Sequence, residues 1–386
     1  MVLKLAAVVC EYNPFHSGHL YHIEKTKAET GCDGVIAVMS GNFVQRGEAA
    51  IFSKEERALA AVESGADLVL ELSPFFALQT AEIFAANALK IITSIPEVCY
   101  LSFGIEENSR KGIERTAQIF SKEAEAFSHL LKQKLGEGVS FPAARQAALE
   151  EMGENEAAEV LKRPNAILAV EYLKALKKFG SAIEPVYITR KGADHDSSAE
   201  TDGFFSASRL REIICGENPE RIYLSVPKEA FEVYKNAKPF KSAAFEKAVI
   251  ANLLKMPAEE LAKITDVSEG LENRIKACAE SAQSLKELAD AIKTKRYTHS
   301  RIRRILLSSY LGIYDSEKYI TPPYAKILGF NKNGRKILNR IKKTSKIPIV
   351  KNMKAVKALK NPELIRLYER EIQADKIYGL FEGENR

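Results

Sequence analysis

The sequence predicts an α/β fold in which a doubly wound parallel sheet is followed by a mostly helical, basic C-terminal part. Over the first hundred residues, short apolar segments rich in Val, Ile and Leu alternate with helical patterns, as strands and helices alternate around a buried parallel sheet. Beyond about residue 220 strand signals almost vanish and positive charge accumulates. We therefore expect two domains, residues 1–220 and 221–386.

The elements of the first domain follow from this alternation. The apolar pattern predicts strands over 5–11, 33–41, 66–73, 98–104 and 183–190, and helices over 19–30, 53–65, 77–92, 163–180 and 206–214. Residues 107–160 are expected to be helical, and the polar stretch 192–203 is expected to be a loop. Ligands of such sheets bind beyond the carboxyl ends of the strands, so we expect a site in the loops after the first, second and fourth strands.

The composition is typical of a globular protein of the cytoplasm. The apolar content of 46% suits a packed core, and no apolar run approaches the roughly 20 residues of a membrane span. The five cysteines are scattered and never spaced Cys-x-x-Cys, which indicates reduced thiols and neither disulfides nor a metal site.

The stretch CEYNPFHSGH, residues 10–19, joins the first strand to the first helix. Asn13-Pro14 ends the strand, Gly18 leaves room for a phosphate to approach the backbone, and the helix is expected to begin near His19. The N–H groups of the helix start and the imidazoles of His16 and His19 can then donate to phosphate oxygens. Such donors lower the barrier to attack on an α-phosphate by about 3–4 kcal/mol each. The motif therefore predicts adenylyl transfer.

Two other interpretations of this motif are weaker. His16, His19 and His22 could form a zinc cluster, but no carboxylate or cysteine lies at ligand spacing nearby. His22 follows His19 by about one helical turn and is expected to pack or to cap. The motif could also be an ordinary tight turn, although its place after the first strand favours nucleotide binding.

Further candidates for nucleotide contacts are scattered along the first domain. Ser206-Ala-Ser208-x-x-Arg211 resembles the serine-rich helix start that nucleotidyltransferases direct at a triphosphate, although serine there is also an ordinary helix cap. The other candidates are Gly104, Asn165, Arg190, Arg46 and Lys54, which have the alternative roles of a turn glycine, a helix cap and surface charges.

Positive charge is concentrated in residues 291–360, which contain 19 Lys and Arg but only 2 Asp and Glu. This segment therefore has a net charge of +17, although the whole chain has a net charge of only +6. Such asymmetry predicts a polyanionic partner, most plausibly nucleic acid. Basic residues surround Tyr297 and His299 and recur on one helical face further on, at Lys293, Lys295, Arg296, Arg301, Arg303, Arg304, Lys336 and Arg340. A solvated basic helix is the alternative, but two basic runs together favour RNA.

Together these motifs make the chain resemble the tRNA(Met) cytidine acetate ligase family. The matching stretches follow in order over nearly the whole chain, and NPFHSGH together with SGNFVQRGE is the most specific combination. RPNAILAVEYLKAL, SASRLR and KRYTHSRIRRILL also match. One departure is Ala193-Asp194 before His195-Asp196, where relatives often carry an aromatic or apolar residue.

The resemblance implies an ATP-dependent ligase. Its first domain would make acetyl-adenylate from ATP and acetate, with Mg²⁺ held largely by ATP and water. Its second domain would bind elongator tRNA(Met), whose wobble cytidine receives the acetyl group on N4. The resemblance also implies an ATP site made of Gly104, Asn165, Arg190 and the segment Ala7, Val8, Val9, Cys10, Glu11, Tyr12, Asn13, Pro14, Phe15, His16, Ser17, Gly18, His19 and Leu20.

Two rival functions remain from the sequence alone. A small-molecule adenylyltransferase of the nicotinate or pantetheine-phosphate type would share the sheet and the His-x-Gly-His motif, but it needs no basic helical appendage. A non-catalytic RNA-binding protein with a decayed nucleotide fold is the other, and the presence of both histidines counts against it. Neither the acetate pocket nor the oligomeric state can be predicted.

Overall fold

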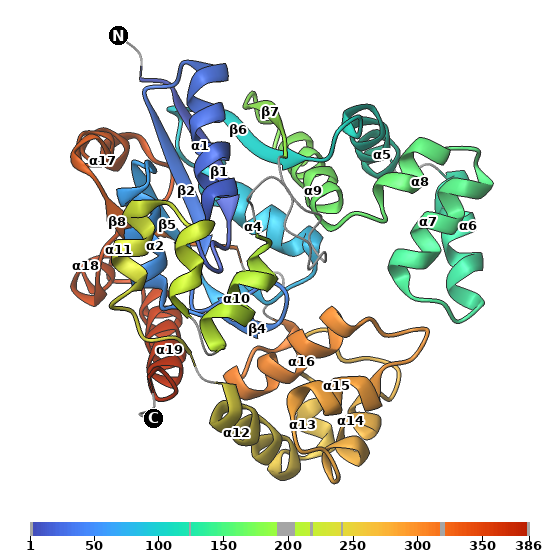
Figure 1. Ribbon diagram of the computed structural model, residues 1–386. Coiled ribbons are helices and arrows are strands. Elements are labelled where there is room, and N and C mark those ends of the chain that lie inside the picture. Colours follow the sequence, from blue (N-terminus) through green and yellow to red (C-terminus); the bar gives the residue numbers. More distant parts are fainter. Residues whose placement is uncertain are drawn as a thin grey trace.

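The computed structural model in Figure 1 describes residues 3–122, 125–190, 205–216, 219–240, 242–316 and 321–383. It contains a seven-stranded sheet with the order β7-β6-β1-β2-β5-β8-β9, in which only β5 and β8 pair antiparallel. The strands are β1 (Leu5–Cys10), β2 (Gly34–Ser40), β5 (Leu68–Leu72), β6 (Val98–Ile105), β7 (Glu184–Thr189), β8 (Ala325–Phe330) and β9 (Ile349–Val350). The doubly wound sheet and its five predicted strands are confirmed, and the order reverses between β1 and β6.

Both faces of the sheet are covered by helices, as the strands' apolar sequences require. Neighbouring residues of β1, such as Ala6 and Ala7, belong to separate cores on opposite faces. The helices of the first half are α1 (Ser17–Thr30), α2 (Lys54–Glu63), α3 (Pro74–Ala77), α4 (Ala81–Thr93), α5 (Arg110–Lys122), α6 (Glu125–Gly136), α7 (Phe141–Glu151), α8 (Asn155–Val160), α9 (Pro164–Lys178), α10 (Ala207–Cys215), the 3₁₀ helix η1 (Pro219–Leu224) and α11 (Lys228–Tyr234). A two-stranded hairpin, β3 (Phe43–Val44) and β4 (Glu48–Ala49), follows β2. Helices α6 to α8 form a side lobe (Figure 1).

The expected boundary at residue 220 does not match how the chain is folded. Residues 222–234 pack into the same core as Tyr12 and Phe15, and β8 and β9 return to the sheet. Of the described residues, those within 3–240 and 321–383 therefore form the sheet domain, and 242–316 form a helical module. The later helices are α12 (Ser242–Lys255), α13 (Ala258–Leu261), α14 (Leu271–Ala279), α15 (Leu285–Ile292), α16 (His299–Leu311), α17 (Lys332–Thr344), α18 (Met353–Lys357) and α19 (Pro362–Gly379).

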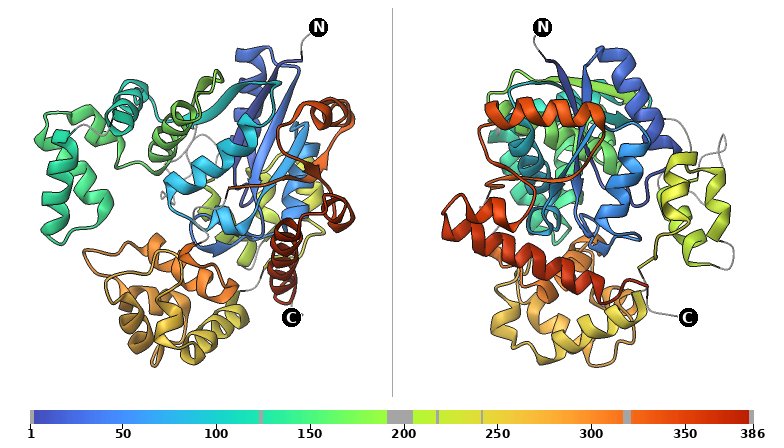
Figure 2. Two further views of the ribbon diagram at one scale, coloured as in Figure 1. Left: turned by 180° about the vertical axis from the view of Figure 1, so that it is seen from behind. Right: turned by 90° about the vertical axis from the view of Figure 1, so that its left-hand side faces the viewer.

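The C-terminal helix α19 joins the helical module to the sheet domain (Figure 2). Ala374 and Tyr378 lie in the core of the module together with Phe43 and Phe75 of the sheet domain, and the Tyr378 hydroxyl donates to the carbonyl of Ala50 at 2.8 Å. Within the described ranges no helix is long and apolar enough to cross a membrane.

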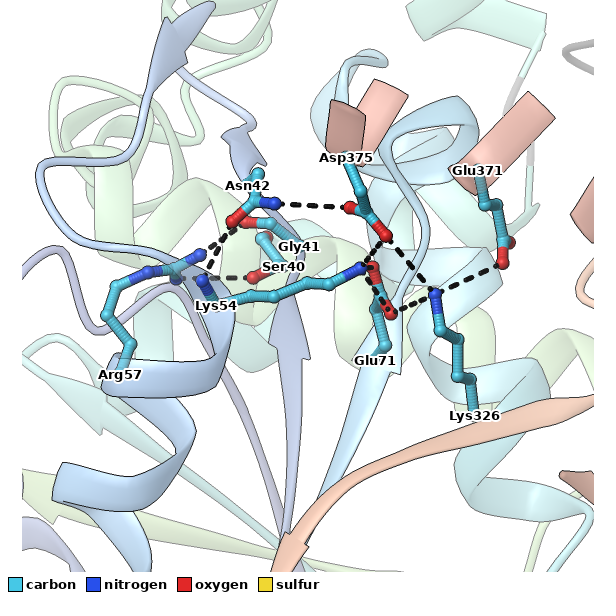
Figure 3. Close-up of polar contacts among 9 residues, drawn as sticks. All are labelled: Ser40, Gly41, Asn42, Lys54, Arg57, Glu71, Lys326, Glu371 and Asp375. Carbon is cyan, nitrogen blue, oxygen red and sulfur yellow. Dashed lines mark hydrogen bonds and ion pairs between the residues drawn. The ribbon is translucent and has the colours of Figure 1, made fainter. Parts of the chain in front are cut away.

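A buried charge cluster lies where α19 meets the sheet (Figure 3). Lys54 Nζ lies 2.8 Å from Glu71 Oε1 and 2.5 Å from Asp375 Oδ2. Lys326 of β8 lies 2.9 Å from Glu71 and 3.7 Å from Glu371. The cluster has two lysines and three carboxyl groups, and its ion pairs hold together strand β8, the start of α2 and α19. It carries one excess negative charge when all three carboxyl groups are ionised.

Candidate active site

A cavity of about 1260 Å³ opens at the carboxyl ends of β1, β6 and β7. Its wall includes the His16–His19 turn after β1, the side formed by α7 and α9, and the start of α16 with the loop before it. The cavity lies beside the point where the strand order reverses, which is the expected ligand position in a doubly wound sheet. It contains part of the residues that the sequence predicted for nucleotide binding and part of those predicted for RNA binding.

The helix α1 begins two residues earlier than the sequence predicted. The helix starts at Ser17, and His16, not a residue near His19, is its N-cap. Nδ1 of His16 accepts a hydrogen bond from the Gly18 N–H at 3.1 Å, and Nδ1 of His19 accepts one from the His16 N–H at 3.2 Å. A ring nitrogen that accepts carries no proton, so Nε2 carries it in both residues. The two stacked rings, 3.8 Å apart, are therefore set as Nε2–H donors.

The lack of a side chain at Gly18 makes room for the His16 imidazole. A Cβ built on Gly18 would lie 2.9 Å from His16 Cε1 and 3.1 Å from its Nδ1, so any side chain there would displace the imidazole. The sequence interpretation, in which Gly18 only makes room for a phosphate, is thus incomplete. The small residue allows His16 to fold back over the helix start.

Residues far along the chain hold this turn in place. The Phe15 N–H donates to the Tyr234 hydroxyl at 2.9 Å, and the Ser17 N–H and hydroxyl both donate to the Ser225 carbonyl at 2.9 Å. The backbone carbonyl of Asn13 accepts from Arg211 at 2.9 Å. Tyr234 and Ser225 are not among the predicted site residues, because the expected boundary at residue 220 places both of them in the second domain.

Arg57 also positions the loops of the site, in this case those after β1 and β2, and the sequence did not predict this role. It is fully buried, and its guanidinium donates to the carbonyls of Glu11, Ser40 and Gly41 at the ends of β1 and β2. Burial lowers the pKa of Arg57. Lys54, in contrast, was a candidate for phosphate binding, and that interpretation is wrong: it is 1% exposed and engaged by Glu71 and Asp375.

Part of the predicted ATP segment faces the cavity. Val9, Cys10, Glu11, Tyr12, Asn13, His16, Gly18 and His19 line it, whereas Ala7, Val8, Pro14, Phe15, Ser17 and Leu20 do not. Among those in the wall, Glu11 accepts a hydrogen bond from the Gln45 N–H at 2.7 Å, and burial raises the pKa of its carboxyl. The end of β1 and the turn that follows it thus bring the imidazoles of His16 and His19 and the carboxyl group of Glu11 to the cavity wall.

The structure brings Gly104, Arg190 and Asn165 together at the carboxyl ends of the neighbouring strands β6 and β7. A Cβ on Gly104 would lie 3.1 Å from Arg190 Cγ, so the absence of a side chain lets Arg190 lie across β6. Asn165 lies in the first turn of α9 and donates to Glu106 at 3.2 Å. Arg163, not Asn165, is the N-cap. All three predicted residues line the cavity.

Of the serine-rich helix start, Ala207 and Arg211 line the cavity, and the two serines do not. Ser206 caps α10 by accepting from the Arg209 N–H at 3.2 Å, and Ser208 accepts from Arg211 at 3.2 Å. Neither serine lines the cavity, whereas Arg211 does. Arg46, the other candidate in the loop after β2, also lines it.

The two basic segments lie in different places. Arg296, Arg301, Arg303 and Arg304 line the cavity, whereas Lys293 and Lys295 are exposed outside it. Lys336 and Arg340 lie on α17, which packs against β2, β5 and β8 and contributes no residue to the cavity wall. Arg340 is there paired with Glu97 at 3.1 Å. The structure therefore assigns only the first segment to the same cavity as the His-x-Gly-His turn.

Within this segment the arginines differ in exposure. Arg303 is part-exposed and donates to Glu48 at 2.9 Å, and Arg296 is exposed and pairs with Glu269 at 2.8 Å. Arg304 is 7% exposed and pairs with Asp266 at 3.2 Å. Arg304 therefore stabilises the module, so the expectation of an exposed phosphate contact at this position is not supported.

Among the described residues, His22 has a structural contact and is not a metal ligand. His22 is bonded to the Ser102 hydroxyl at 2.9 Å, and burial lowers its pKa to about 4, as expected for a packed neutral imidazole. In the described part of the chain no three His, Cys, Asp or Glu side chains are grouped as metal ligands. The departure at Ala193 to Asp196 falls outside the described residues.

Comparisons with known proteins agree with this geometry. The HIGH Nucleotidyl Transferase family model matches residues 3–386. A tRNA(Met) cytidine acetate ligase of Acetivibrio thermocellus is 38% identical over 97% of this chain and 94% of its own, and one of Clostridium tetani is 41% identical over 90% of both. The apo crystal structure of Thermotoga maritima TmcAL is 33% identical, with a TM-score of 0.92 over 99% of this chain and 96% of its own. The same enzyme bound with alpha-thio ATP gives 0.90 over 99% and 95%.

Proposed function

Because the chain belongs to the HIGH nucleotidyl transferases and, among them, to the tRNA(Met) cytidine acetate ligase family, we propose that it activates acetate with ATP and acetylates N4 of the wobble cytidine of elongator tRNA(Met). One observation carries the proposal beyond the family. A single cavity holds both the imidazole pair after β1 and the arginines at the start of α16, so one space can receive ATP and RNA. A small-molecule adenylyltransferase would not need the arginines at the start of α16.

In the first step a carboxylate oxygen of acetate attacks the α-phosphorus of ATP. The bond from this phosphorus to the bridging oxygen breaks, pyrophosphate leaves and acetyl-adenylate remains. Negative charge grows on the α-phosphate oxygens, where the Nε2–H groups of His16 and His19 would donate hydrogen bonds. The chemistry needs positioning and charge stabilisation and no nucleophile from the protein.

In the second step the N4 amine of cytosine attacks the acetyl carbonyl carbon. The bond from this carbon to the phosphate oxygen breaks, AMP leaves, and the excess proton of the amine passes to AMP or solvent. An anticodon wobble base is unpaired in the free tRNA, so presenting it at the cavity costs little. Arg296, Arg301 and Arg303 would contact the RNA phosphates. A tRNA substrate would place this reaction in the cytoplasm.

Mg²⁺ would enter with ATP. The described cavity wall offers few free ligands, because every carboxylate in it except Glu11 is already ion-paired with a lysine or arginine: Glu48, Glu82, Glu171, Asp266 and Asp290. That set fits an ion held mainly by phosphate oxygens and water.

The test is mass spectrometry of tRNA nucleosides after incubation of the protein with ATP, isotope-labelled acetate and tRNA. We expect labelled N4-acetylcytidine, and no transfer from labelled acetyl-CoA when ATP is absent. Label in neither nucleotide nor tRNA would favour the small-molecule adenylyltransferase, which transfers the adenylyl group to an acceptor other than acetate.

A matched pair of variants tests the imidazoles. His16→Asn keeps an N-cap oxygen that can accept from Gly18, because Asn is a preferred N-cap residue, but it removes the Nε2–H donor. We expect His16→Asn and His19→Ala to lose acetyl-adenylate formation roughly 100-fold or more while circular dichroism and the melting temperature of His16→Asn stay near wild type. Normal rates in both variants would contradict the phosphate-donor roles.

A further inference from the structure

Phe141, at the start of α7, is exposed in an unusual place. Its side chain is 50% exposed and lines the cavity. The other Phe and Tyr residues in the described cavity wall are less exposed, and Phe84, Phe103 and Tyr172 are between 2% and 6% exposed. A large apolar ring left in water inside a ligand cavity indicates a partner that covers it.

The helix start that carries the ring is tied to neighbouring residues despite the exposure of the ring. Ser140 caps the helix by accepting from the Ala143 N–H. One turn on, the Arg145 guanidinium lies 5.4 Å from the Phe141 ring and 3.9 Å from Phe120. Arg145 is fixed in turn by Glu171 of α9 at 3.0 Å. Phe141 is therefore presented by a braced helix start.

The side lobe also meets the basic loop across the cavity. A Cβ built on Gly138 would lie 3.7 Å from Nη2 of Arg296. Phe141 thus stands three residues from a point of contact with the arginine-lined wall. A phosphate backbone bound on that wall would bring its bases within the space that the aromatic ring faces.

We propose that the Phe141 ring is the platform on which the target pyrimidine base of the RNA stacks when its N4 amine enters the cavity. The proposal rests on the proposed function for the identity of the base. Stacking on an aromatic ring is how proteins commonly hold an unpaired RNA base. The positive charge on the facing wall favours RNA over an uncharged partner.

The experiment compares wild type, Phe141→Ala and Phe141→Tyr, with Tyr223→Ala as a matched loss of an aromatic residue that is 60% exposed outside the cavity. We expect kcat/KM for tRNA acetylation to fall roughly 5- to 150-fold in Phe141→Ala, the range for loss of one base stack. Phe141→Tyr and Tyr223→Ala should stay near wild type. Acetyl-adenylate formation without tRNA should be unchanged in all four proteins.

Unchanged tRNA acetylation by Phe141→Ala would overturn the proposal. A rise in KM for ATP in the tRNA-free assay would also overturn it, because the adenine ring and not the RNA base would then use Phe141. A second arm uses an anticodon stem-loop RNA with a fluorescent cytosine analogue at the wobble position. Binding should quench its fluorescence in wild type and less so in Phe141→Ala. This arm reports on stacking even if wild type acetylates no tRNA, a result that would contradict the proposed function alone.

Discussion

Gly47 lies directly against the main chain of Arg303. A Cβ built on Gly47 would lie 2.6 Å from the Arg303 carbonyl carbon and 2.5 Å from the backbone nitrogen of Arg304. Beside it, Glu48 accepts a hydrogen bond from Arg303 and lies 3.6 Å from Arg211. The hairpin after β2 and the helix α16 therefore meet at a glycine, so the wall that carries the arginines is set directly by the sheet domain.

Gly47→Ala should separate the two half-reactions. The added methyl group must push α16 away, because backbone atoms of Arg303 and Arg304 cannot rotate aside. We expect tRNA acetylation to fall roughly tenfold or more, while acetyl-adenylate formation stays within a few-fold of wild type. Separate assays of the two steps measure this.

Gly153→Ala is the matched control. Gly153 has the same φ of +76° as Gly47 but no atom within 4 Å of an added Cβ. Both variants share the strain of an alanine at positive φ, about 1–2 kcal/mol, and only Gly47→Ala has the clash. Equal losses of acetylation in the two variants would mean that strain, and not the position of α16, is responsible.

The structure also gives a sharper prediction for RNA binding. Lys293, Lys295 and Arg296 are exposed beside the cavity, so replacing the three by Ala should weaken tRNA binding. The slope of log Kd against log salt concentration should become shallower by about 0.7 for each lost phosphate contact. Filter binding over a salt series measures both quantities.

Lys336→Ala with Lys343→Ala provides the comparison on α17. Because α17 packs away from the cavity, we expect this pair to change the slope less than the first set. A larger effect from α17 would move the main RNA surface to that helix. Acetyl-adenylate formation should be unchanged in both sets.

The sequence predicted the sheet well where strands are buried on both faces, as in β1, β2 and β5. It missed β8, whose Lys326 interrupts the apolar pattern and is buried only because Glu71, Glu371 and Asp375 neutralise it. It also missed β9 and the hairpin, because segments of two residues have no periodicity.

The site was predicted from local motifs and missed wherever a contact joins distant parts of the chain. His16 and His19 are adjacent to a strand end in the sequence, so their place could be inferred. The roles of Tyr234 for Phe15 and of Asp375 for Lys54 depend on contacts over 219 and 321 residues. No spacing rule reaches that far, which is why Lys54 was misassigned to phosphate binding.

The buried charge cluster predicts a pH dependence of stability. Burial raises the pKa of Glu371 to about 7, and the neighbouring lysines lower the pKa of Glu71 to about 2 against its desolvation. Between pH 4.5 and 7 the folded state holds a proton on Glu371 that the unfolded state releases, so this group makes the protein less stable as pH rises. Glu71 has the opposite effect, because its pKa is lower in the folded state. It stabilises the folded protein fully above pH 4.5, and this stabilisation is lost as the pH falls from 4.5 towards 2.

Glu371→Gln removes the excess negative charge of the cluster. We expect it to be more stable than wild type at pH 8, by about 1–3 kcal/mol in the free energy of unfolding, with a smaller difference at pH 5.5. Denaturant unfolding at the two pH values measures this. Glu369→Gln, at an exposed position of the same helix, should show no such trend. If the two substitutions behave alike, Glu371 is ionised at no cost in the folded state.

The last prediction concerns Gly18 and the histidine that lies over it. An alanine at this position suits an α-helix, so Gly18→Ala alone should stabilise or leave unchanged the start of α1. Its Cβ would fall 2.9 Å from His16 Cε1, which forces the imidazole out of its cap position. We therefore expect acetyl-adenylate formation to fall roughly tenfold or more, the effect of misplacing one charge-stabilising donor, while the melting temperature stays within a few degrees of wild type. Combining Gly18→Ala with His16→Asn should add little further loss, because the two changes remove the same donor. Additive losses would instead show that Gly18 serves the nucleotide independently of His16.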